Sequence, residues 1–257
     1  MKNVVVIIQA RMGSSRLPGK VLMDISGKPM LWHVINRVKK SKKIDLIVVA
    51  TTTEDEEYPI LKLSRDIGVE TFLGNEEDVL DRYYQAAKKF NADIIVRVTS
   101  DCPIVDPDII DMFVDYYLDN STNFDYIGVG KDSLCPNGVG CEVFSFKALH
   151  KAWLESKLLS EREHVTPYIW KNDKIFRLGR PLKPKKDLSR LRWTVDEKRD
   201  IKFVRELYKD LYVEDNFFST KDVLELLERK PILIKINQGI IRNEGYIKSL
   251  KEDKIID

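Results

Sequence analysis

The apolar run at residues 4–8, VVVII, is the feature that most constrains what this chain can fold into. Five consecutive β-branched residues are typical of a strand that is buried on both faces, as in a parallel sheet. Further strand-like runs alternate with segments that have the spacing of amphipathic helices. The predicted strands are 46–50, 69–73 and 94–98, and the predicted helices are 30–40, 53–67 and 76–90. This alternation predicts an α/β fold with a mostly parallel, Rossmann-like central sheet flanked by helices.

Two loops of this first half follow strands directly. They span residues 9–20 and 99–106, after the runs at 4–8 and 94–98. Right-handed crossovers place every strand-to-helix loop of a parallel sheet along one edge. Ligands of such open sheets lie at the carboxyl ends of the strands. We therefore expect the two loops to converge on one site.

The second half is less regular and predicts a small mixed α+β region. Two strands, 125–130 and 140–144, are expected to flank a turn at Pro136-Asn137-Gly138. The other expected elements are a strand at 192–195, helices at 146–158, 197–208 and 220–228, a helical or loop segment at 162–172, and an exposed charged loop at 183–186. No repeat or long linker separates independent domains, so residues 1–257 are interpreted as one domain.

The composition argues against several classes of protein. The 257 residues carry 43 Lys and Arg against 41 Asp and Glu, a formal net charge of +2. General nucleic-acid or membrane-surface binders usually show a basic excess, so we expect neither partner. The three cysteines form no CxxC pair and only three histidines are present, which argues against structural zinc. Without a signal-peptide pattern or an apolar stretch of about 18 residues, we expect a cytoplasmic protein.

The loop at residues 9–20, QARMGSSRLPGK, combines small and basic residues and contains no acid. Gly13, Ser14 and Ser15 allow close backbone approach and offer N–H and hydroxyl donors to phosphate oxygens. Arg11 and Arg16 can bind phosphate oxygens bidentately, and Lys20 supplies a compact positive charge. The loop matches neither the GxxxxGK[ST] nor the GxGxxG pattern. A solvated basic loop is the alternative, but the position after a buried strand favours a phosphate site.

Residues 4–20, VVVIIQARMGSSRLPGK, resemble the opening signature of cytidylyltransferases that activate acidic sugars, such as the synthetases of CMP-linked 3-deoxy-octulosonate and sialic-type acids. The spore-coat polysaccharide biosynthesis branch is the closer match. The resemblance continues with GKPML at 27–31, VVATTT at 48–53, EEDVLDRYYQAA at 76–87, RVTSDCPIVDP at 97–107, GVGCEVFSFKAL at 138–149, REHVTPYIW at 162–170 and LRWTVDEKRDI at 191–201. Ordered matches over nearly the whole chain are specific for the family and much less so for the acceptor.

The resemblance implies a GT-A-like fold, CTP as the nucleotide and a homodimer. Residues 1–120 would form the nucleotide-binding half, and 121–257 would bind the acceptor and supply a dimer contact. It also implies that Asp101 and Asp196 share a Mg²⁺ ion. Mg²⁺ prefers hard oxygen ligands, usually one or two carboxylates plus phosphate oxygens. The alternative for each aspartate is an N-cap at a strand-to-helix junction, which is the reading that we prefer for Asp106 and Asp108.

Further site residues are assigned with the help of the resemblance. Arg11, Arg16, Lys20 and Asp101 form the expected catalytic set. The nucleotide-binding set comprises the loop residues Ala10, Arg11, Gly13, Ser14, Ser15, Arg16 and Lys20, together with Thr51, Thr52, Asp78, Arg82 and Thr99. A simple strand-end turn is the alternative for the two threonines at 51 and 52.

The acceptor is assigned to Arg97, Glu142, Glu163 and His164. Arg97 is a charge within a predicted buried strand, so it must either pair with a carboxylate or reach substrate. A structural, hydrogen-bonded histidine is the alternative for His164. Cys102 is rejected as a nucleophile, because no histidine signals a catalytic dyad.

The function predicted is Mg²⁺-dependent transfer of CMP from CTP to an acidic sugar or a small phosphorylated acceptor, releasing pyrophosphate, in surface polysaccharide or glycan biosynthesis. One alternative is a GT-A glycosyltransferase that uses a nucleotide sugar. Such enzymes usually carry a D-x-D metal motif, whereas this strand end reads Ser100-Asp101-Cys102. The other alternative is a non-catalytic nucleotide-binding protein, against which the intact Arg16, Lys20, Asp101 and Asp196 argue.

Overall fold

Seven strands form one sheet in the order β5-β4-β1-β6-β8-β7-β9 in a computed structural model, which describes residues 2–130, 133–214 and 216–256. The strands are β1 Val4–Gln9, β4 Leu46–Thr52, β5 Glu70–Gly74, β6 Ile94–Thr99, β7 Tyr126–Ile127, β8 Glu142–Ser145 and β9 Leu178–Gly179. β5, β4, β1 and β6 are parallel, and β8 runs antiparallel to β6 and β7. The predicted α/β fold is confirmed.

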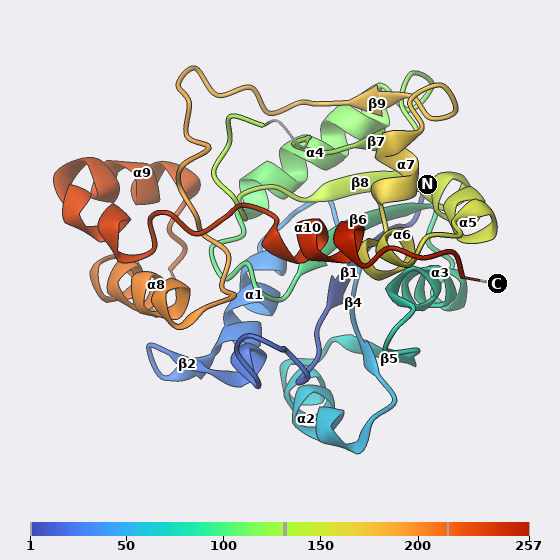
Figure 1. The fold of residues 1–257 in the computed structure, drawn as a ribbon. Coiled ribbons are helices and arrows are strands. Elements are labelled where there is room, and N and C mark those ends of the chain that lie inside the picture. The colour runs from blue at the N-terminus through green and yellow to red at the C-terminus, as the bar shows by residue number, and fades with distance from the viewer. Residues whose placement is uncertain (1, 131–132, 215, 257) are drawn as a thin grey trace.

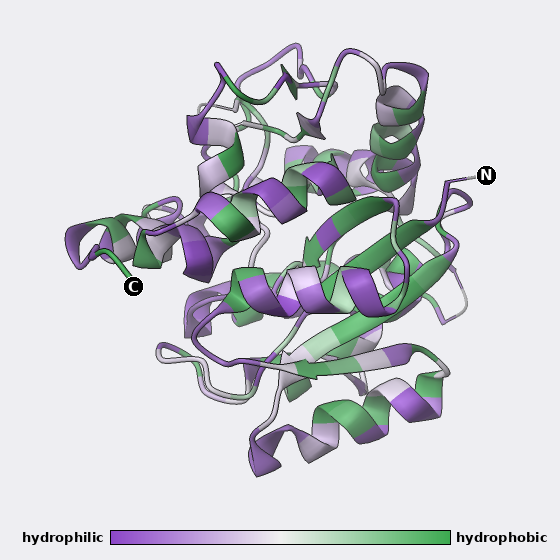
Figure 2. Ribbon diagram, turned by 90° about the vertical axis from the view of Figure 1, so that its right-hand side faces the viewer, coloured by the Kyte–Doolittle hydropathy of each residue, from purple (hydrophilic) through white to green (hydrophobic). Residues whose placement is uncertain are grey.

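Helices cover both faces of this sheet (Figure 1). α1 Met30–Val38, α2 Tyr58–Ile67 and α4 Pro107–Asp119 pack on one face, and α3 Val79–Lys89, α5 Phe146–Glu155 and α7 Pro167–Lys171 pack on the other. Val4, Val6 and Ile8 point into the first of these cores, whereas Val5 and Ile7 point into the second. The strands are therefore hydrophobic along most of their length (Figure 2).

The strand order creates a switch point between β1 and β6. From β1 the chain moves outward through β4 to β5, and it then returns to β6 on the other side of β1. The loops that leave β1 and β6 therefore start from the ends of adjacent strands, where ligands of open α/β sheets bind. These are the loop 9–20, which carries the predicted phosphate-binding residues, and the loop 99–106.

A third core lies beside the sheet and surrounds the buried side chain of Trp193. It is built by α8 Lys198–Leu211, α9 Thr220–Arg229, the 3-10 segment η3 Pro231–Ile236 and the hairpin of β2 Asp24–Ile25 and β3 Lys28–Pro29. The chain then returns as α10 Glu244–Lys251, which lies over α6 Leu159–His164 (Figure 1). Two short 3-10 turns, η1 Lys20–Leu22 and η2 Asp55–Glu57, complete the described elements.

Several predicted boundaries are wrong for local reasons. The helix expected at 76–90 begins only at Val79, because the Asp78 carboxylate accepts a hydrogen bond from the Asp81 N–H at 2.9 Å and so caps α3. The strand expected at 192–195 makes only an isolated bridge between Asn137 and Arg192. The segment 162–172 is divided between α6 and α7, and α10 was not predicted at all. Across the described ranges, no helix is long and apolar enough to cross a bilayer.

His33 joins α1 to the hairpin and to α8. Its Nε2 lies 2.6 Å from the carbonyl oxygen of Ile25, and its ring packs edge-on against Tyr208 with centroids 4.7 Å apart. Burial lowers the pKa of His33 to about 4, from the usual 6.5. The imidazole is therefore neutral in the folded protein at physiological pH.

We expect the free energy of unfolding to fall as the pH is lowered from 6.5 towards 4, because the unfolded state then binds a proton that the folded His33 does not. In His33→Gln the amide can still donate to Ile25, but the titration is removed, so the slope should decrease. The difference should be at most about 3 kcal/mol. Denaturant unfolding at a series of pH values measures this, and an equal slope in both proteins would contradict it.

Candidate active site

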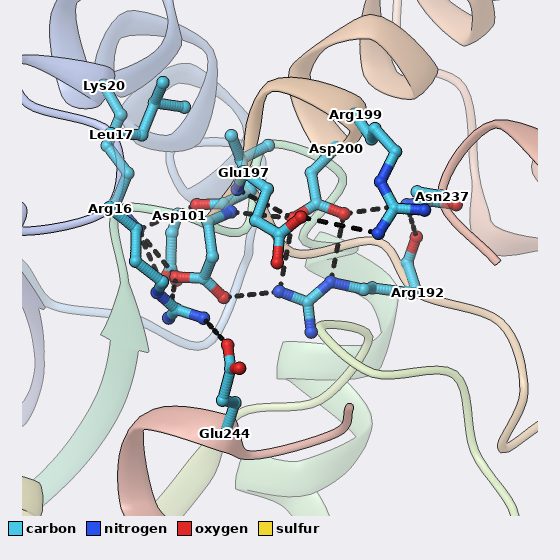
Figure 3. A network of polar contacts seen from close by, with 12 residues as sticks. Arg16, Leu17, Lys20, Asp101, Arg192, Glu197, Arg199, Asp200, Asn237 and Glu244 are labelled. Atoms are coloured by element: carbon cyan, nitrogen blue, oxygen red, sulfur yellow. Dashed lines mark hydrogen bonds and ion pairs between the residues drawn. The ribbon is translucent and has the colours of Figure 1, made fainter. Parts of the chain in front are cut away.

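The carboxylates of Asp101 and Asp196 meet at the ammonium group of Lys20. Figure 3 shows Lys20 and Asp101 within a wider network of polar contacts. Lys20 Nζ lies 3.3 Å from Asp101 Oδ2 and 2.9 Å from Asp196 Oδ1, and it donates a hydrogen bond of 2.7 Å to the Val195 carbonyl. The cluster lies at the carboxyl ends of β1 and β6. The predicted convergence of the loops 9–20 and 99–106 is therefore confirmed.

Backbone pairing brings Asp196 into this cluster. The Val195 N–H donates to the Asp101 carbonyl at 2.8 Å, which joins the segment before α8 to the turn after β6. Neither aspartate caps a helix, because Glu197 is the N-cap of α8 and Asp106 is the N-cap of α4. The N-cap alternative is thus wrong for Asp101 and Asp196, whereas it is confirmed for Asp106.

Opposite charges keep the buried groups ionised. Burial would raise the pKa of the Asp101 carboxyl, but the Lys20 ammonium and a hydrogen bond of 2.5 Å from the Thr99 hydroxyl hold it below its usual range. Burial would lower the pKa of Lys20, yet the two carboxylates raise it. Lys20 and Asp101 therefore both carry charge at neutral pH.

Two arginines, Arg16 and Arg192, complete the shell of charges around Asp196; both arginines are labelled in Figure 3. Arg16 Nη2 lies 3.0 Å from Asp196 Oδ1, and Arg192 Nη2 lies 2.6 Å from Asp196 Oδ2. Arg192 is buried and also pairs with Asp200 at 3.0 Å, whereas Arg16 is more exposed and pairs with Glu244 of α10 at 2.7 Å. The sequence analysis missed Arg192 and Glu244. Arg192 lies within the predicted strand 192–195, and a charged residue within a strand could have identified it as a candidate site residue, as it did for Arg97.

The loop after β1 is anchored at its ends and open in its middle. The Met12 carbonyl accepts from the N–H groups of Ser14 and Gly19, and the left-handed backbone at Gly19 (φ 68°) closes the turn. Leu17 is buried, while Gly13 and Ser15 are exposed. The donors that the sequence assigned to phosphate binding therefore face an accessible surface.

A buried carboxylate that the sequence analysis missed holds this loop in place. Glu57 is 3% exposed; its Oε1 accepts from the Met12 N–H at 3.0 Å and its Oε2 accepts from the Thr51 hydroxyl at 2.6 Å. It ties the loop to the end of β4. Its sequence position, at the start of a helix, suggested only a surface charge.

The donor set fits a divalent cation that takes few protein ligands. No group of three or more His, Cys, Asp or Glu side chains in the described part of the chain is placed to hold a metal. Asp101 and Asp196 nevertheless direct oxygens to one point, where Lys20 Nζ now lies. Mg²⁺ usually takes one or two carboxylates and fills its remaining coordination positions with phosphate oxygens and water.

Comparison with known proteins identifies the family. The family model described as cytidylyltransferase matches residues 5–238. The chain belongs to the cytidylyltransferase family. The resemblance noted from the sequence motifs is thus confirmed, and CTP-dependent nucleotidyl transfer is the activity that this family membership supports.

Individual relatives agree with this assignment over nearly the whole chain. A cytidylyltransferase structure from Leptospira borgpetersenii is 33% identical, with a TM-score of 0.88 over 94% of this chain and 100% of that chain. An uncharacterized protein of Methanocaldococcus jannaschii is 41% identical over 95% of this chain and 98% of its own length. The spore coat polysaccharide biosynthesis protein SpsF of Bacillus subtilis is 30% identical over 90% of this chain and 96% of its own length.

In this cytidylyltransferase several residues of the predicted nucleotide-binding set have structural partners. Thr51 and Thr52 lie at the end of β4, but both are buried. Arg82 donates to the carbonyls of Asn75 and Glu76 at 2.9 Å each, and Asp78 caps α3 and pairs with Arg162. Ala10 is buried, and its N–H donates to the Ala50 carbonyl. These contacts shape the walls of the site, and the contacts of these residues with the nucleotide stay predictions.

The side chains assigned to acceptor binding also contact other side chains of the protein. Arg97 pairs with Glu142, which confirms the carboxylate alternative for this arginine, and Glu142 further accepts from the hydroxyls of Tyr126 and Thr166. His164 Nε2 lies 3.0 Å from the Ser249 hydroxyl of α10, which in turn donates to Glu163 at 2.7 Å.

The pKa values of two nearby side chains indicate the protonation state in which each is present. Burial lowers the pKa of His164 to about 4, so its imidazole is neutral at physiological pH. This agrees with the structural alternative for this histidine. Burial also raises the pKa of the Cys102 thiol, which agrees with its rejection as a nucleophile.

Replacing Lys20 should expose the affinity of the two carboxylates for a cation. In Lys20→Ala, Asp101 and Asp196 lose their shared partner, so the free energy of unfolding should fall by about 2–3 kcal/mol. Mg²⁺ should then raise the melting temperature of this variant more than that of the parent. The control is Lys20→Ala combined with Asp101→Asn, which should lose the Mg²⁺ effect. An equal Mg²⁺ shift in Lys20→Ala and the parent would contradict a cation site at these carboxylates.

Glu244 should compete with the triphosphate for Arg16. The pair is solvent-accessible, with side chains 35% and 43% exposed, so its free energy is about 0–1 kcal/mol. We expect Glu244→Gln to lower the KM for CTP by a factor of about 2–5 and to leave kcat unchanged. Glu252→Gln, on the exposed end of the same helix, is the matched control. An unchanged or raised KM in steady-state assays would rule out this competition.

Proposed function

We propose that this protein catalyses Mg²⁺-dependent transfer of CMP from CTP to an acidic sugar or a small phosphorylated acceptor, with release of pyrophosphate. The observation that supports this most is the meeting of Lys20 with Asp101 and Asp196 at the switch point of the sheet. An exposed basic loop lies beside the same point. A polyphosphate with a divalent cation is the ligand that these charges complement.

The protein's own residues position and neutralise the substrate. Arg11 and Arg16 would release Glu76 and Glu244, their present partners at 3.6 and 2.7 Å, to bind the β- and γ-phosphates. Lys20 would stabilise the charge that develops on the departing pyrophosphate. Transfer of this type depends on positioning and charge neutralisation rather than on a covalent nucleophile.

The two carboxylates of the site would hold the divalent cation. Asp101 and Asp196 would hold Mg²⁺, which, when bound, neutralises the α-phosphate and lowers the pKa of the acceptor hydroxyl. The acceptor oxygen attacks the α-phosphorus as the bond to the pyrophosphate oxygen breaks. Thr99 fixes the Asp101 carboxylate, and the Val195–Asp101 backbone bond fixes the distance between the two aspartates.

The biological setting is supported by similarity. The spore coat protein of Bacillus subtilis and the motif resemblance to synthetases of CMP-linked sugar acids both favour a role in surface polysaccharide or glycan biosynthesis. The homodimer and the cytoplasmic location stay predictions. A glycosyltransferase would not explain the exposed Arg- and Lys-rich loop, since a nucleoside diphosphate sugar has no γ-phosphate.

Asp101→Asn should abolish pyrophosphate release and leave the fold intact. The amide keeps an oxygen for the Thr99 hydroxyl, but it removes the negative charge that Lys20 and Mg²⁺ require. We expect a fall in kcat of at least about 1000-fold, in line with the loss of an essential charge at a transition state. A coupled pyrophosphatase and phosphate assay with CTP measures it, beside the other three nucleotides.

Asp108→Asn is the matched control, because Asp108 is an exposed carboxylate in the first turn of α4. It should retain activity. Mg²⁺-dependent pyrophosphate release by Asp101→Asn at the parental rate would refute the assignment. Tight CTP binding by the parent without turnover on any acceptor would instead favour a non-catalytic nucleotide-binding protein.

A further inference from the structure

A basic cavity lies beside Arg192, at the edge of the third core. Its volume is about 300 Å³, and its wall includes the loop residue Asn137, the arginines at 190, 192 and 242, and Gly239. Among the described residues that line it there is no carboxylate. Its volume lies at the lower end of the range for small-molecule sites. Arg192 links it to the reaction centre, because this arginine also contacts Asp196.

Arg242 is the side chain in this cavity whose hydrogen-bonding capacity is least used. Its Nη1 donates to the Cys135 carbonyl at 2.8 Å, while its Nε is buried and has no hydrogen-bond partner. Burial lowers the pKa of the Arg242 guanidinium, and within residues 2–130, 133–214 and 216–256 it forms no ion pair. The protein itself therefore uses only part of the hydrogen-bonding capacity of this guanidinium.

The other arginines near the site differ in whether a carboxylate pairs with them. Arg192 is held by Asp196 and Asp200, and Arg97 is held by Glu142. Arg190, by contrast, is exposed on the cavity rim, and no salt bridge to it occurs among the described side chains. Arg190 lies near Asp187 without forming an ion pair with it, so Arg190 and Arg242 leave positive charge at the cavity that no close ion pair of the described residues neutralises.

The cavity is closed by a segment that the family match does not reach. The cytidylyltransferase model ends at residue 238, whereas Gly239, Ile240 and Arg242 form one wall of the cavity. Asn237 fixes the start of this segment by donating to the Arg192 carbonyl and to Asp200, both at 3.0 Å. Arg242 fixes its other end through Cys135. The wall is therefore a built feature of this chain and not a loose terminus.

We propose that this cavity binds the anionic group of the molecule that accepts CMP, with Arg242 and Arg190 as the residues that recognise it. This rests on the proposed function for the identity of the ligand. Arg242 would bind two oxygens of a carboxylate or phosphate through its planar guanidinium, a pairing that this fork geometry favours. Arg242 is then a specificity-determining residue supplied by the C-terminal segment.

The first experiment tests whether the cavity binds an anion, independently of enzyme activity. Crystals of the parent and of Arg242→Gln are soaked in selenate, an oxyanion whose selenium is located by anomalous scattering. We expect a selenium peak between Arg190 and Arg242 in the parent and none in Arg242→Gln. Absence of the peak in the parent, or equal peaks in both proteins, would overturn the anion site whatever the enzyme turns over.

The second experiment distinguishes the sources of the anion. Acceptor KM is measured with 3-deoxy-manno-octulosonate, which carries a carboxylate, and with glycerol 1-phosphate, which carries a phosphate. For the acceptor that is used, Arg242→Gln and Arg190→Gln should raise the acceptor KM at least about tenfold and leave the KM for CTP unchanged. Arg242→Lys keeps the charge without the fork and should lie between parent and Arg242→Gln. Arg229→Gln, on the surface of α9, is the matched control.

The outcomes separate the two proposals. An unchanged acceptor KM in Arg242→Gln would overturn the inference and leave the proposed function standing. No pyrophosphate release by the parent with either acceptor would count against the proposed function, while the selenate experiment still decides the pocket. Arg190→Gln guards against a folding defect, because Arg190 lies on an exposed loop and its replacement leaves the Cys135 contact intact.

Discussion

The ammonium group of Lys20 is the point on which the rest of the site depends. It joins three segments that are distant in sequence: the loop after β1, the turn after β6 and the segment before α8. Two partly buried carboxylates that face each other would repel without a cation between them. Lys20 provides that cation in the free protein and keeps Asp101 and Asp196 aligned. A site prepared in this way can exchange an internal cation for substrate-bound charge without rebuilding its backbone.

The cations around this point differ in how firmly they are held. Arg192 is buried and pairs with both Asp196 and Asp200, and the Asn237 side chain donates a hydrogen bond to the Arg192 carbonyl. Arg16 is exposed by about a third and shares its contacts with a surface glutamate. A buried, doubly paired arginine acts as scaffold, whereas an exposed one can change partners at little free-energy cost. The same contrast separates Arg97, which pairs with Glu142 inside the sheet, from Arg242, which forms no ion pair among the described residues.

The C-terminal segment connects both sides of the site. Arg242 lines the basic cavity, and two residues later Glu244 pairs with Arg16 of the loop 9–20. Further along, the Ser249 hydroxyl is hydrogen-bonded to His164 of α6. None of these three C-terminal positions lies within the part of the chain that the family model covers. The loop with Lys20 and the turn with Asp101 thus lie within the part of the chain that the family model covers, whereas the segment that closes the basic cavity extends beyond it.

The sequence by itself determined the parallel half of the fold and the loops that border the site. The β-branched run of β1 can be buried only on both faces, and strand and helix periodicities are local properties, so β1, β4, β5 and β6 were predictable with their helices. The parallel topology then required the loops carrying Lys20 and Asp101 to share one edge. Boundaries were less reliable, as at Asp78, because a single capping hydrogen bond decides where a helix begins.

Only the tertiary structure decided which charges meet. The partner of Arg97, the role of Glu57 under the loop, and the position of Asp196 all depend on contacts between segments far apart in the chain. A periodic pattern records which face of an element is buried, but it does not record which side chain lies opposite. The segment at 192–195 illustrates this, since its apolar composition suggested a strand, whereas one backbone bond to Asp101 brings Asp196 to the site and places Arg192 beside the cavity.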